Sequence, residues 1–220
     1  MRKMRTHRLI PSRFPTISLF DWAASQEELE QLAELEGLTN DRLKTQLGDI
    51  YLIAREEWVC GPGSTPLMAA FTHPGNSRFS DGSYGVYYAG DSLETAVAET
   101  TFHRERFLRA SNEAPCLIQM REYIAHVQQP LEQLNLTTHA EVLHPDPGQY
   151  FISQAFAKTL REKKIWGLYY PSVRKKNAHC VAIFRPQALA IPQQGCHLEY
   201  IWNGAQIVEI RQSTLLNIFN

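Results

Sequence analysis

The middle of the chain carries a strand-like segment that runs through a tight turn into a helix. Val86, Tyr87 and Tyr88 have the β-branched and aromatic character of a short strand. The sequence Asp91-Ser92-Leu93-Glu94 is an N-terminal capping signature for the helix that follows. Because segments of both kinds recur elsewhere in the chain, this unit predicts a mixed fold with strands and helices in one core.

Further segments with the same alternation of types lie towards the C-terminus. Strand-like stretches occur at 116–123, 166–170 and 179–184. A helix with a basic last turn is predicted from about 149 to 163. The segments 198–202 and 205–210 flank Asn203-Gly204, a dipeptide typical of a two-residue hairpin turn. The sequence therefore favours an α+β architecture.

The N-terminal part is predicted to be helical from about 25 to 58. Ser25 begins a capping box, and leucines at helical spacing follow until Gly37. A second helix is predicted from Asn40 to about Trp58, because apolar residues recur every three or four positions. The stretch 72–85 holds three Gly, one Pro and two Asn or Asp residues and is predicted to be an exposed loop.

Composition places the chain in the class of single globular domains. The 220 residues are 44% hydrophobic, which is enough for one sizeable core, so we predict one domain over 1–220. The formal net charge of −1 disfavours a general nucleic-acid binder. No apolar run approaches the roughly 18 to 20 residues that span a bilayer, and the basic start leads into Pro11 rather than an apolar stretch. We therefore expect a cytoplasmic protein without membrane contact.

Cysteine and histidine spacing gives little support for a disulfide framework or a metal site. The four cysteines lie far apart, so reduced and mostly buried thiols are expected. The pairs His179-Cys180 and Cys196-His197 have the residue types that bind zinc. Neighbours on a strand point to opposite faces, however, so at most one residue of each pair can face a common ion. No metal is expected.

Several well-known catalytic motifs do not occur. The chain has neither G-x-G-x-x-G nor G-x-x-x-x-G-K-[ST], the glycine patterns that let backbone amides approach phosphates. It also has no G-x-S-x-G and no H-E-x-x-H, which removes the sequence arguments for an α/β-hydrolase or a zinc protease.

Four residues form a more informative set: Arg78, Tyr88 ten positions on, Glu99 eleven further, and Ser172 downstream. Each also has a purely structural interpretation, as a loop charge, a core aromatic, a helix-surface acid and a turn residue. The apolar stripe that precedes Glu99 on its predicted helix favours a functional interpretation, because it places the carboxylate at the boundary of the core. We therefore predict that Glu99 lies at the edge of a cleft.

This pattern resembles the RES domain family, the toxin component of bacterial toxin–antitoxin pairs. The residues that carry the resemblance are Arg8 in His7-Arg8-Leu9, Arg78 in Ser77-Arg78-Phe79-Ser80, Tyr88 with Ala89, Glu99 in the run from Glu94 to Thr100, and Ser172 in Tyr170-Pro171-Ser172-Val173. The run from Arg78 to Thr100 is the specific part. Arg13 competes with Arg8 for the N-terminal arginine position, and Tyr87 competes with Tyr88.

The resemblance implies a fold similar to ADP-ribosyltransferases of the diphtheria-toxin type, with a mixed β core and flanking helices. It also implies that NAD is the substrate, consumed by phosphorolysis, by hydrolysis or by ADP-ribosylation of a protein. A small helix-turn-helix antitoxin and a homodimer are the partners that it implies, with no direct contact between this chain and nucleic acid. The predicted helical segment from Ser25 to Trp58 matches no motif of the family that we can place.

The residue types fit cleavage of the nicotinamide–ribose bond. Positive charge develops on the ribose as neutral nicotinamide leaves, and Glu99 is the candidate acid that meets this charge. Arg8 and Arg78 are the candidates that hold the pyrophosphate, because planar guanidinium groups bind phosphate through two hydrogen bonds. Tyr88 is expected to stack on nicotinamide or ribose and to use its hydroxyl on the sugar. Ser172 is expected to hold either Glu99 or a ribose hydroxyl.

His103 lies one helical turn beyond Glu99 and has two interpretations, as a group that tunes this acid or contacts the nucleophile, or as a structural histidine. The sequence thus predicts an NAD-degrading toxin with phosphate or water as acceptor. A protein ADP-ribosyltransferase that uses the same cleft is the first alternative. A non-catalytic nucleotide-binding or antitoxin-docking module is the second, and a purely structural protein is the third.

Overall fold

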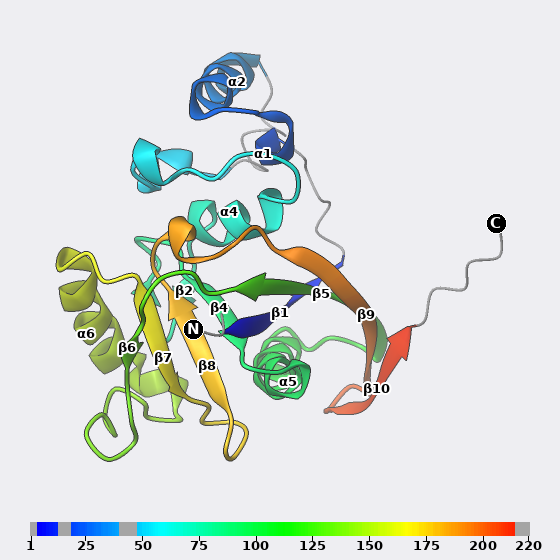
Figure 1. The fold of residues 1–220 in the computed structure, drawn as a ribbon. Helices are drawn as coiled ribbons and strands as arrows, with labels where there is room; N and C mark the ends of the chain where they lie inside the picture. Colours follow the sequence, from blue (N-terminus) through cyan, green and yellow to red (C-terminus); the bar gives the residue numbers. More distant parts are fainter. Residues whose placement is uncertain (1–3, 13–18, 40–47, 214–220) are drawn as a thin grey trace.

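The computed structural model describes residues 4–12, 19–39 and 48–213, and these form one mixed sheet with helices on both sides (Figure 1). The strands are β1 (Arg5–Pro11), β2 (Asn76–Ser77), β3 (Ser80–Asp81), β4 (Tyr87–Gly90), β5 (Cys116–His126), β6 (Glu132–Gln133), β7 (Gly167–Pro171), β8 (His179–Ile183), β9 (Gln193–Trp202) and β10 (Ile207–Ser213). The helices are α1 (Leu19–Trp22), α2 (Gln26–Thr39), α4 (Thr65–Thr72), α5 (Leu93–Ala110) and α6 (Tyr150–Glu162), with 3-10 turns η1 (Ile50–Leu52), η2 (Arg55–Glu57), η3 (Pro147–Gln149) and η4 (Pro186–Ala188).

The sheet has the strand order β10-β9-β5-β1-β4-β8-β7-β6, and a separate hairpin is formed by β2 and β3. Neighbouring strands of the sheet are antiparallel except β6 and β7. The sheet has two halves, β10-β9-β5-β1 and β4-β8-β7-β6. A single residue pair joins them, His7 of β1 with Gly90 of β4, whereas β1 pairs with β5 at seven positions. Figure 1 shows β7 and β8 crossing the direction of β1 and β5 steeply. The centre of the sheet is therefore where its two halves part.

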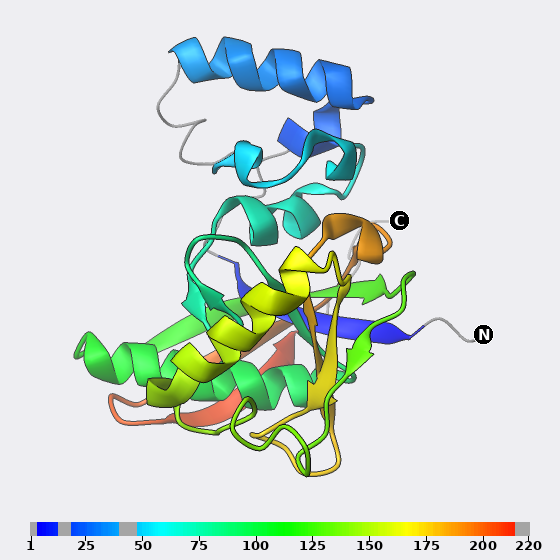
Figure 2. The ribbon, with the colours of Figure 1, turned by 90° about the vertical axis from the view of Figure 1, so that its left-hand side faces the viewer.

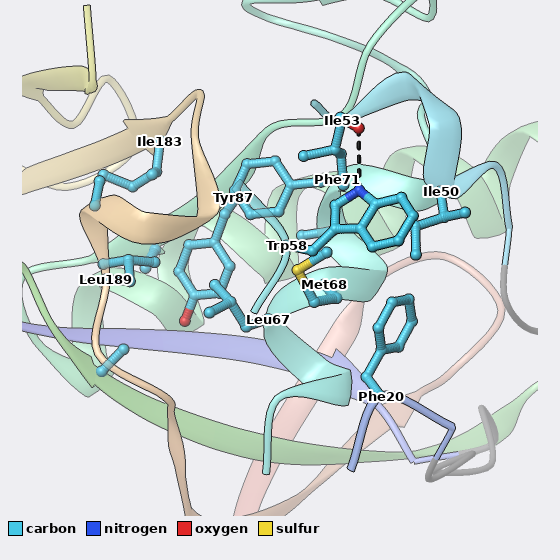
Figure 3. Close-up of a cluster of buried hydrophobic side chains, with 14 of the residues drawn as sticks. Phe20, Ile50, Ile53, Trp58, Leu67, Met68, Phe71, Tyr87, Ile183 and Leu189 are labelled. Atoms are coloured by element: carbon cyan, nitrogen blue, oxygen red, sulfur yellow. Dashed lines mark hydrogen bonds between the residues drawn. The ribbon is translucent and has the colours of Figure 1, made fainter. Parts of the chain in front are cut away.

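Three groups of buried side chains hold the layers together. The α4 cluster fills the space between the N-terminal helices and one face of the sheet, with Phe20, Trp58, Phe71 and Tyr87 among its members (Figures 2 and 3). On the other face, the α6 cluster packs α6 against β7 and β8, and its members include Phe79, Ala157, Leu168, Tyr170, Cys180 and Ala182. The α5 cluster packs α5 against β1, β5 and β9, and its buried members are Leu9, Ala96, Met120, Leu198 and Tyr200. Successive residues of β4 point to opposite faces, so Tyr87 and Ala89 belong to the α4 cluster and Tyr88 packs against the α6 cluster.

The predicted helix from Asn40 to about Trp58 is wrong for the part that the structure describes. Residues 48–58 form the two short turns η1 and η2, and residues 40–47 lie outside the described residues. Ile53 and Ala54 between the turns have extended backbone angles, with ψ of 132° and 137°. The indole of Trp58 donates a hydrogen bond to the carbonyl of Ile53 at 3.0 Å, shown in Figure 3. The apolar spacing thus reflects burial in the α4 cluster rather than a helical stripe.

The predicted helix starts at Ser25 and Ser92 are confirmed. The Ser25 hydroxyl accepts a hydrogen bond from the amide of Glu28, and the Glu28 carboxylate accepts one from the amide of Ala24. The Ser92 hydroxyl accepts one from the amide of Thr95, so α5 begins directly after β4 as predicted. Side-chain acceptors at these positions satisfy amides that have no partner within the helix.

Several elements of the structure are not predicted from the sequence. They include strand β1, strand β6 and helix α4. Helix α4 buries most of its circumference, including Leu67, Met68 and Phe71, so its sequence shows no amphipathic stripe. The stretch 72–85 also differs from the predicted exposed loop, because it holds the β2–β3 hairpin and several buried side chains.

Smaller differences concern the last hairpin and the thiols. The amide of Asn203 donates to the carbonyl of Gln206, so the turn of the β9–β10 hairpin lies at 204–205 rather than at Asn203-Gly204. All four cysteines are free, as predicted, but the expectation that they are mostly buried is wrong. Cys180 is buried, two others are partly buried and Cys116 is exposed.

A buried carboxylate ties three strands together beside the joint between β1 and β4. Glu122 on β5 is 4% exposed and is hydrogen-bonded to Nδ1 of His7 on β1. Its other oxygen accepts the amide of Cys196 on β9 at 3.0 Å. Burial by itself raises the pKa of Glu122, but the hydrogen bonds from His7 and Cys196 outweigh it and leave the pKa below its ordinary value.

This pair predicts a loss of stability in acid. A lowered pKa in the folded protein means that the stabilisation is complete above the ordinary value of 4.5 and is lost as pH falls through the folded value. Glu122→Gln is expected to lower the free energy of unfolding at neutral pH by about 1–3 kcal/mol and to flatten the fall of Tm below about pH 4.5. Thermal unfolding from about pH 3 to 7 measures both, with the exposed Glu132→Gln as control. An unchanged acid slope in Glu122→Gln would contradict this account.

Candidate active site

Glu99 lies on α5 where this helix faces the ends of β7 and β8. The helix is anchored by its apolar residues in the α5 cluster and by a hydrogen bond between the hydroxyls of Thr100 and Tyr200 at 2.8 Å. Glu99 is partly buried, so its predicted place at the boundary of the core is confirmed. Its Oε1 accepts a hydrogen bond from the hydroxyl of Ser172 at 2.6 Å.

Ser172 follows directly after β7 and is held in a tight turn. Its amide donates to the carbonyl of Ala178 at 2.8 Å. Its Oγ accepts hydrogen bonds from the amides of Arg174 and Lys175 at 3.1 and 3.0 Å. Because a hydroxyl has one proton, these acceptor bonds leave that proton for Glu99. Of the two roles predicted for Ser172, this geometry corresponds to holding Glu99.

The turn from β4 into α5 depends on a glycine at position 90. A Cβ atom there would lie 2.7 Å from the amide nitrogen of Ala96, so helix and strand approach too closely for a side chain. The carboxylate of Asp91 then binds the amide of His179 at 2.8 Å and the hydroxyl of Thr95 at 2.7 Å. The start of α5 is thereby fixed to β8, and with it the position of Glu99.

Arg78 lies at the tip of the β2–β3 hairpin and is only 7% exposed. Its guanidinium donates to the carbonyl of His144 at 2.8 Å and lies over the ring of Tyr150, 4.7 Å from the centroid. The carbonyl of Arg78 accepts the hydroxyl of Ser153 at 2.5 Å. Arg78 forms no ion pair with a carboxylate among the described residues, so its positive charge is uncompensated there.

The hydroxyl of Tyr88 is used inside the protein. It is hydrogen-bonded to the hydroxyl of Ser77 at 2.9 Å and accepts the amide of Phe79 at 2.9 Å. Both partners flank Arg78, so Tyr88 orients the arginine loop. Two protein groups thus use this hydroxyl, and one further hydrogen-bonding site of it remains. The expected use of the hydroxyl on a sugar stays a prediction. The pKa of Tyr88 lies well above the ordinary value, chiefly because of burial.

Tyr170 of β7 connects the arginine loop to Glu99. Its ring contacts that of Phe79 edge-on, with centroids 5.1 Å apart. Burial raises the pKa of Tyr170. Phe79 directly follows Arg78, and its amide donates to the hydroxyl of Tyr88. Ser172, which donates to Glu99, lies two residues after Tyr170. A chain of contacts through Phe79 and Tyr170 therefore links the loop of Arg78 and the hydroxyl of Tyr88 to Ser172 and Glu99.

Arg8 is placed differently, because it faces the α4 cluster across the joint between β1 and β4. Its guanidinium lies over the ring of Tyr87, 4.6 Å from the centroid, and reaches only the backbone carbonyl of Tyr88, at 3.4 Å. Tyr87 and Tyr88 are successive residues of a strand and point to opposite faces. Arg8 is thus not in contact with Glu99 or Arg78. Its competitor Arg13 lies outside the described residues.

Two buried polar groups at this joint have no hydrogen-bond partner among the described residues: Nε of Arg8 and the hydroxyl of Tyr87. Burial is the main cause that lowers the pKa of Arg8. A partly buried cation with no carboxylate partner among the described residues is costly unless something else compensates it. This position is therefore suited to an anionic ligand.

The structure adds one residue that the sequence did not single out for this site. Sγ of Cys180 lies 3.6 Å from Oε1 of Glu99. In the sequence, Cys180 is notable as a buried thiol and as a possible metal ligand beside His179, which instead stacks on Tyr169. His103 is exposed on α5 and contacts the ring of Phe102 edge-on.

Other kinds of site find no support in the described part of the chain. It contains no group of three or more His, Cys, Asp or Glu side chains that could hold a metal ion. Within it, no helix has both the length and the apolar character needed to cross a membrane. A cavity of about 510 Å³ lies beside the second half of α5, but Arg78, Glu99 and Ser172 do not line it.

Fold and site together define a mixed α/β domain in which an acid on a central helix meets a serine from the sheet beside an uncompensated arginine. The model of the RES domain family matches residues 49–203, and the chain therefore belongs to this family. The match includes Arg78, Tyr88, Glu99 and Ser172 but not Arg8. A relative is "Uncharacterized protein y4oC" of Sinorhizobium fredii (strain NBRC 101917 / NGR234), 27% identical over 214 residues, which cover 91% of this chain and 84% of that protein.

Membership of the family fixes the broad class. RES domains have an α+β fold like that of ADP-ribosyltransferases, which the large mixed sheet with its few helices confirms. They are associated with toxin–antitoxin systems and with the use of NAD.

Proposed function

We propose that this protein is a toxin that degrades NAD by cleaving the nicotinamide–ribose bond, with phosphate or water as acceptor. The observation that carries the proposal is the Glu99 carboxylate, which Ser172 anchors at one oxygen, while Tyr170, two residues before Ser172, contacts the ring of Phe79 beside Arg78. Membership of an NAD-associated family supports it.

Glu99 supplies the charge that the reaction requires. As the bond to nicotinamide breaks, the ribose becomes an oxocarbenium-like cation. A unit charge pair about 4 Å apart at an effective dielectric constant near 20 interacts by about 4 kcal/mol, which corresponds to roughly a thousandfold in rate. The hydrogen bond from Ser172 fixes the carboxylate before the charge develops, so little reorganisation is needed.

The two arginines bind the pyrophosphate in this proposal. Arg78 carries a buried charge without a carboxylate partner in the described residues, and so does Arg8 at the joint between β1 and β4. Arg8 lies over Tyr87, and Arg78 lies beside the partners of Tyr88, so the two arginines are on opposite faces of β4. The proposal therefore requires the dinucleotide to pass the joint where β1 and β4 share a single residue pair. Tyr88 orients the Arg78 loop through its hydroxyl and offers its ring to the ligand.

We further propose a cognate helix-turn-helix antitoxin as the partner that restrains the activity, a homodimer as the assembly and the cytoplasm as the location. The association of the family with toxin–antitoxin systems supports the antitoxin. The net charge of −1 agrees with a chain that leaves contact with DNA to its partner.

Product analysis tests the proposal and separates the acceptors. Purified protein, freed of any inhibitor, is incubated with NAD with and without phosphate. Nicotinamide release is expected in both cases if water is an acceptor, with ADP-ribose-1″-phosphate formed only when phosphate is present. Label transferred to protein would instead identify an ADP-ribosyltransferase. Intact NAD together with a higher Tm would identify a non-catalytic nucleotide-binding module, and intact NAD with no shift in Tm would remove NAD from the account altogether.

A further inference from the structure

Cys180 lies on β8 beside the Glu99 carboxylate. It lies directly opposite Tyr170 of β7 and is 3% exposed. Its Sγ is 3.6 Å from Oε1 of Glu99, within the range of a hydrogen bond that involves sulfur. The hydroxyl of Ser172 is 2.6 Å from the same oxygen. One oxygen of the carboxylate therefore has two neighbours that are able to donate, one from the end of β7 and one from β8.

The thiol is a donor rather than a nucleophile. Burial, followed by the charge of Glu99, raises the pKa of Cys180 well above its ordinary value. The thiol therefore keeps its proton at any working pH, and a carboxylate oxygen is the acceptor in reach. Ser172 is likewise a donor to Glu99, because its oxygen already accepts hydrogen bonds from two backbone amides. Both protons are thus available to Oε1.

The second oxygen of Glu99 has a different environment. No side chain or backbone group of the described residues forms a hydrogen bond with Oε2. The carboxylate is thus anchored at one oxygen, while the other has no hydrogen-bond partner among the described residues. An acid that must meet a cation developing at one carbon benefits from such an arrangement, since its orientation is fixed before the reaction begins.

We propose that Cys180 is a positioning residue for Glu99: its thiol donates a second hydrogen bond to Oε1, so that Ser172 and Cys180 together turn Oε2 towards the ribose. The inference rests on the proposed function of Glu99. The competing explanation is that Cys180 only fills volume in the α6 cluster, beside Tyr170 and Ala182. The two explanations differ in what happens when the donor is removed and the volume is kept.

Three substitutions separate donation from packing. Cys180→Ser keeps a donor, Cys180→Ala removes it, and Cys180→Val removes it while filling the space. With NAD as substrate, we expect Ala and Val to lower kcat about three- to tenfold with KM unchanged, and Ser to retain activity within about threefold. Cys196→Ala, a thiol outside the site, is the matched control.

A measurement on Glu99 itself tests the role of Cys180 without NAD cleavage. In protein labelled with ¹³C at glutamate carboxyls, the resonance of the Glu99 carboxyl is expected to move in Cys180→Ala and Cys180→Val, but not in Cys196→Ala. If kcat and this resonance both stay unchanged while the wild type cleaves NAD, Cys180 only packs, and the proposed function still stands. If the wild type releases no nicotinamide, the proposed function fails, while the carboxyl resonance still decides whether Cys180 binds Glu99.

Discussion

Replacing Glu99 with glutamine is expected to slow nicotinamide release roughly a thousandfold while the protein stays folded. Glutamine has the same shape, and its amide oxygen is still able to accept the hydroxyl of Ser172, so packing at the end of β7 is preserved. What disappears is the negative charge that meets the ribose cation. The effect should fall on kcat, since the charge interacts with the transition state far more than with the bound substrate.

The matched control is Glu94→Gln, an exposed acid in the first turn of the same helix. It is expected to leave the rate of nicotinamide release within about twofold, because a charge in open solvent is screened. Circular dichroism and Tm establish that both variants are folded. A Glu99→Gln protein that cleaves NAD at the wild-type rate would remove this carboxylate from the mechanism.

Arg8→Met is expected to weaken NAD binding about 10- to 100-fold without lowering the stability of the ligand-free protein. The affinity falls because charge-assisted hydrogen bonds to phosphate contribute roughly 1.5–3 kcal/mol. The stability is maintained because the guanidinium has a buried Nε without a partner and no carboxylate among the described residues to offset its charge. An apolar side chain of similar length removes that unfavourable burial.

Arg5→Met on the same strand is the control, because Arg5 is exposed. It is expected to bind NAD as the wild type does. Isothermal titration on an inactive Glu99→Gln background measures affinity without turnover, and Tm measures stability. If Arg8→Met binds NAD normally, Arg8 does not hold the dinucleotide, and the pyrophosphate site reduces to Arg78. A fall in Tm would show instead that Arg8 supports the joint between β1 and β4.

Local signals in the sequence predict much of the central unit of the fold. The β-branched and aromatic run at 86–88, followed by a capping serine, is sufficient to predict β4 and the start of α5, because caps and strand propensity act within a few residues. The same holds for α6, β7 and β8, whose bounds agree with the prediction to within about two residues.

Elements whose burial is decided by distant contacts are not predictable in this way. Residues 48–58 have apolar residues at helical spacing, yet the backbone at Ile53 and Ala54 is extended. The apolar side chains of this segment are buried by packing against α4 and not on one face of a helix. Helix α4 itself is apolar on most sides and gives no periodic signal. The hairpin that holds Arg78 depends on Tyr88 and on α6, which lie at other positions of the sequence.

The sequence predicts which residues belong to the candidate site better than it predicts the contacts between them. The bond between Ser172 and Glu99 was one of two alternatives, and the position of Glu99 at the edge of the core followed from its helix. The internal bonds of the Tyr88 hydroxyl and the approach of Cys180 depend on the register of β4, β7 and β8, which no local pattern specifies. The placement of Arg8 over Tyr87 likewise depends on how two strands separate after a single pair.

The central claim is that Glu99 faces the ribose carbon whose bond to nicotinamide is cut. A crystal structure of Glu99→Gln protein soaked with intact NAD tests it most directly. We predict that residue 99 is in van der Waals contact with this carbon, with its other oxygen position on Ser172 and the pyrophosphate beside Arg78. A dinucleotide bound elsewhere on the protein, or with its nicotinamide end turned away from residue 99, would contradict the account.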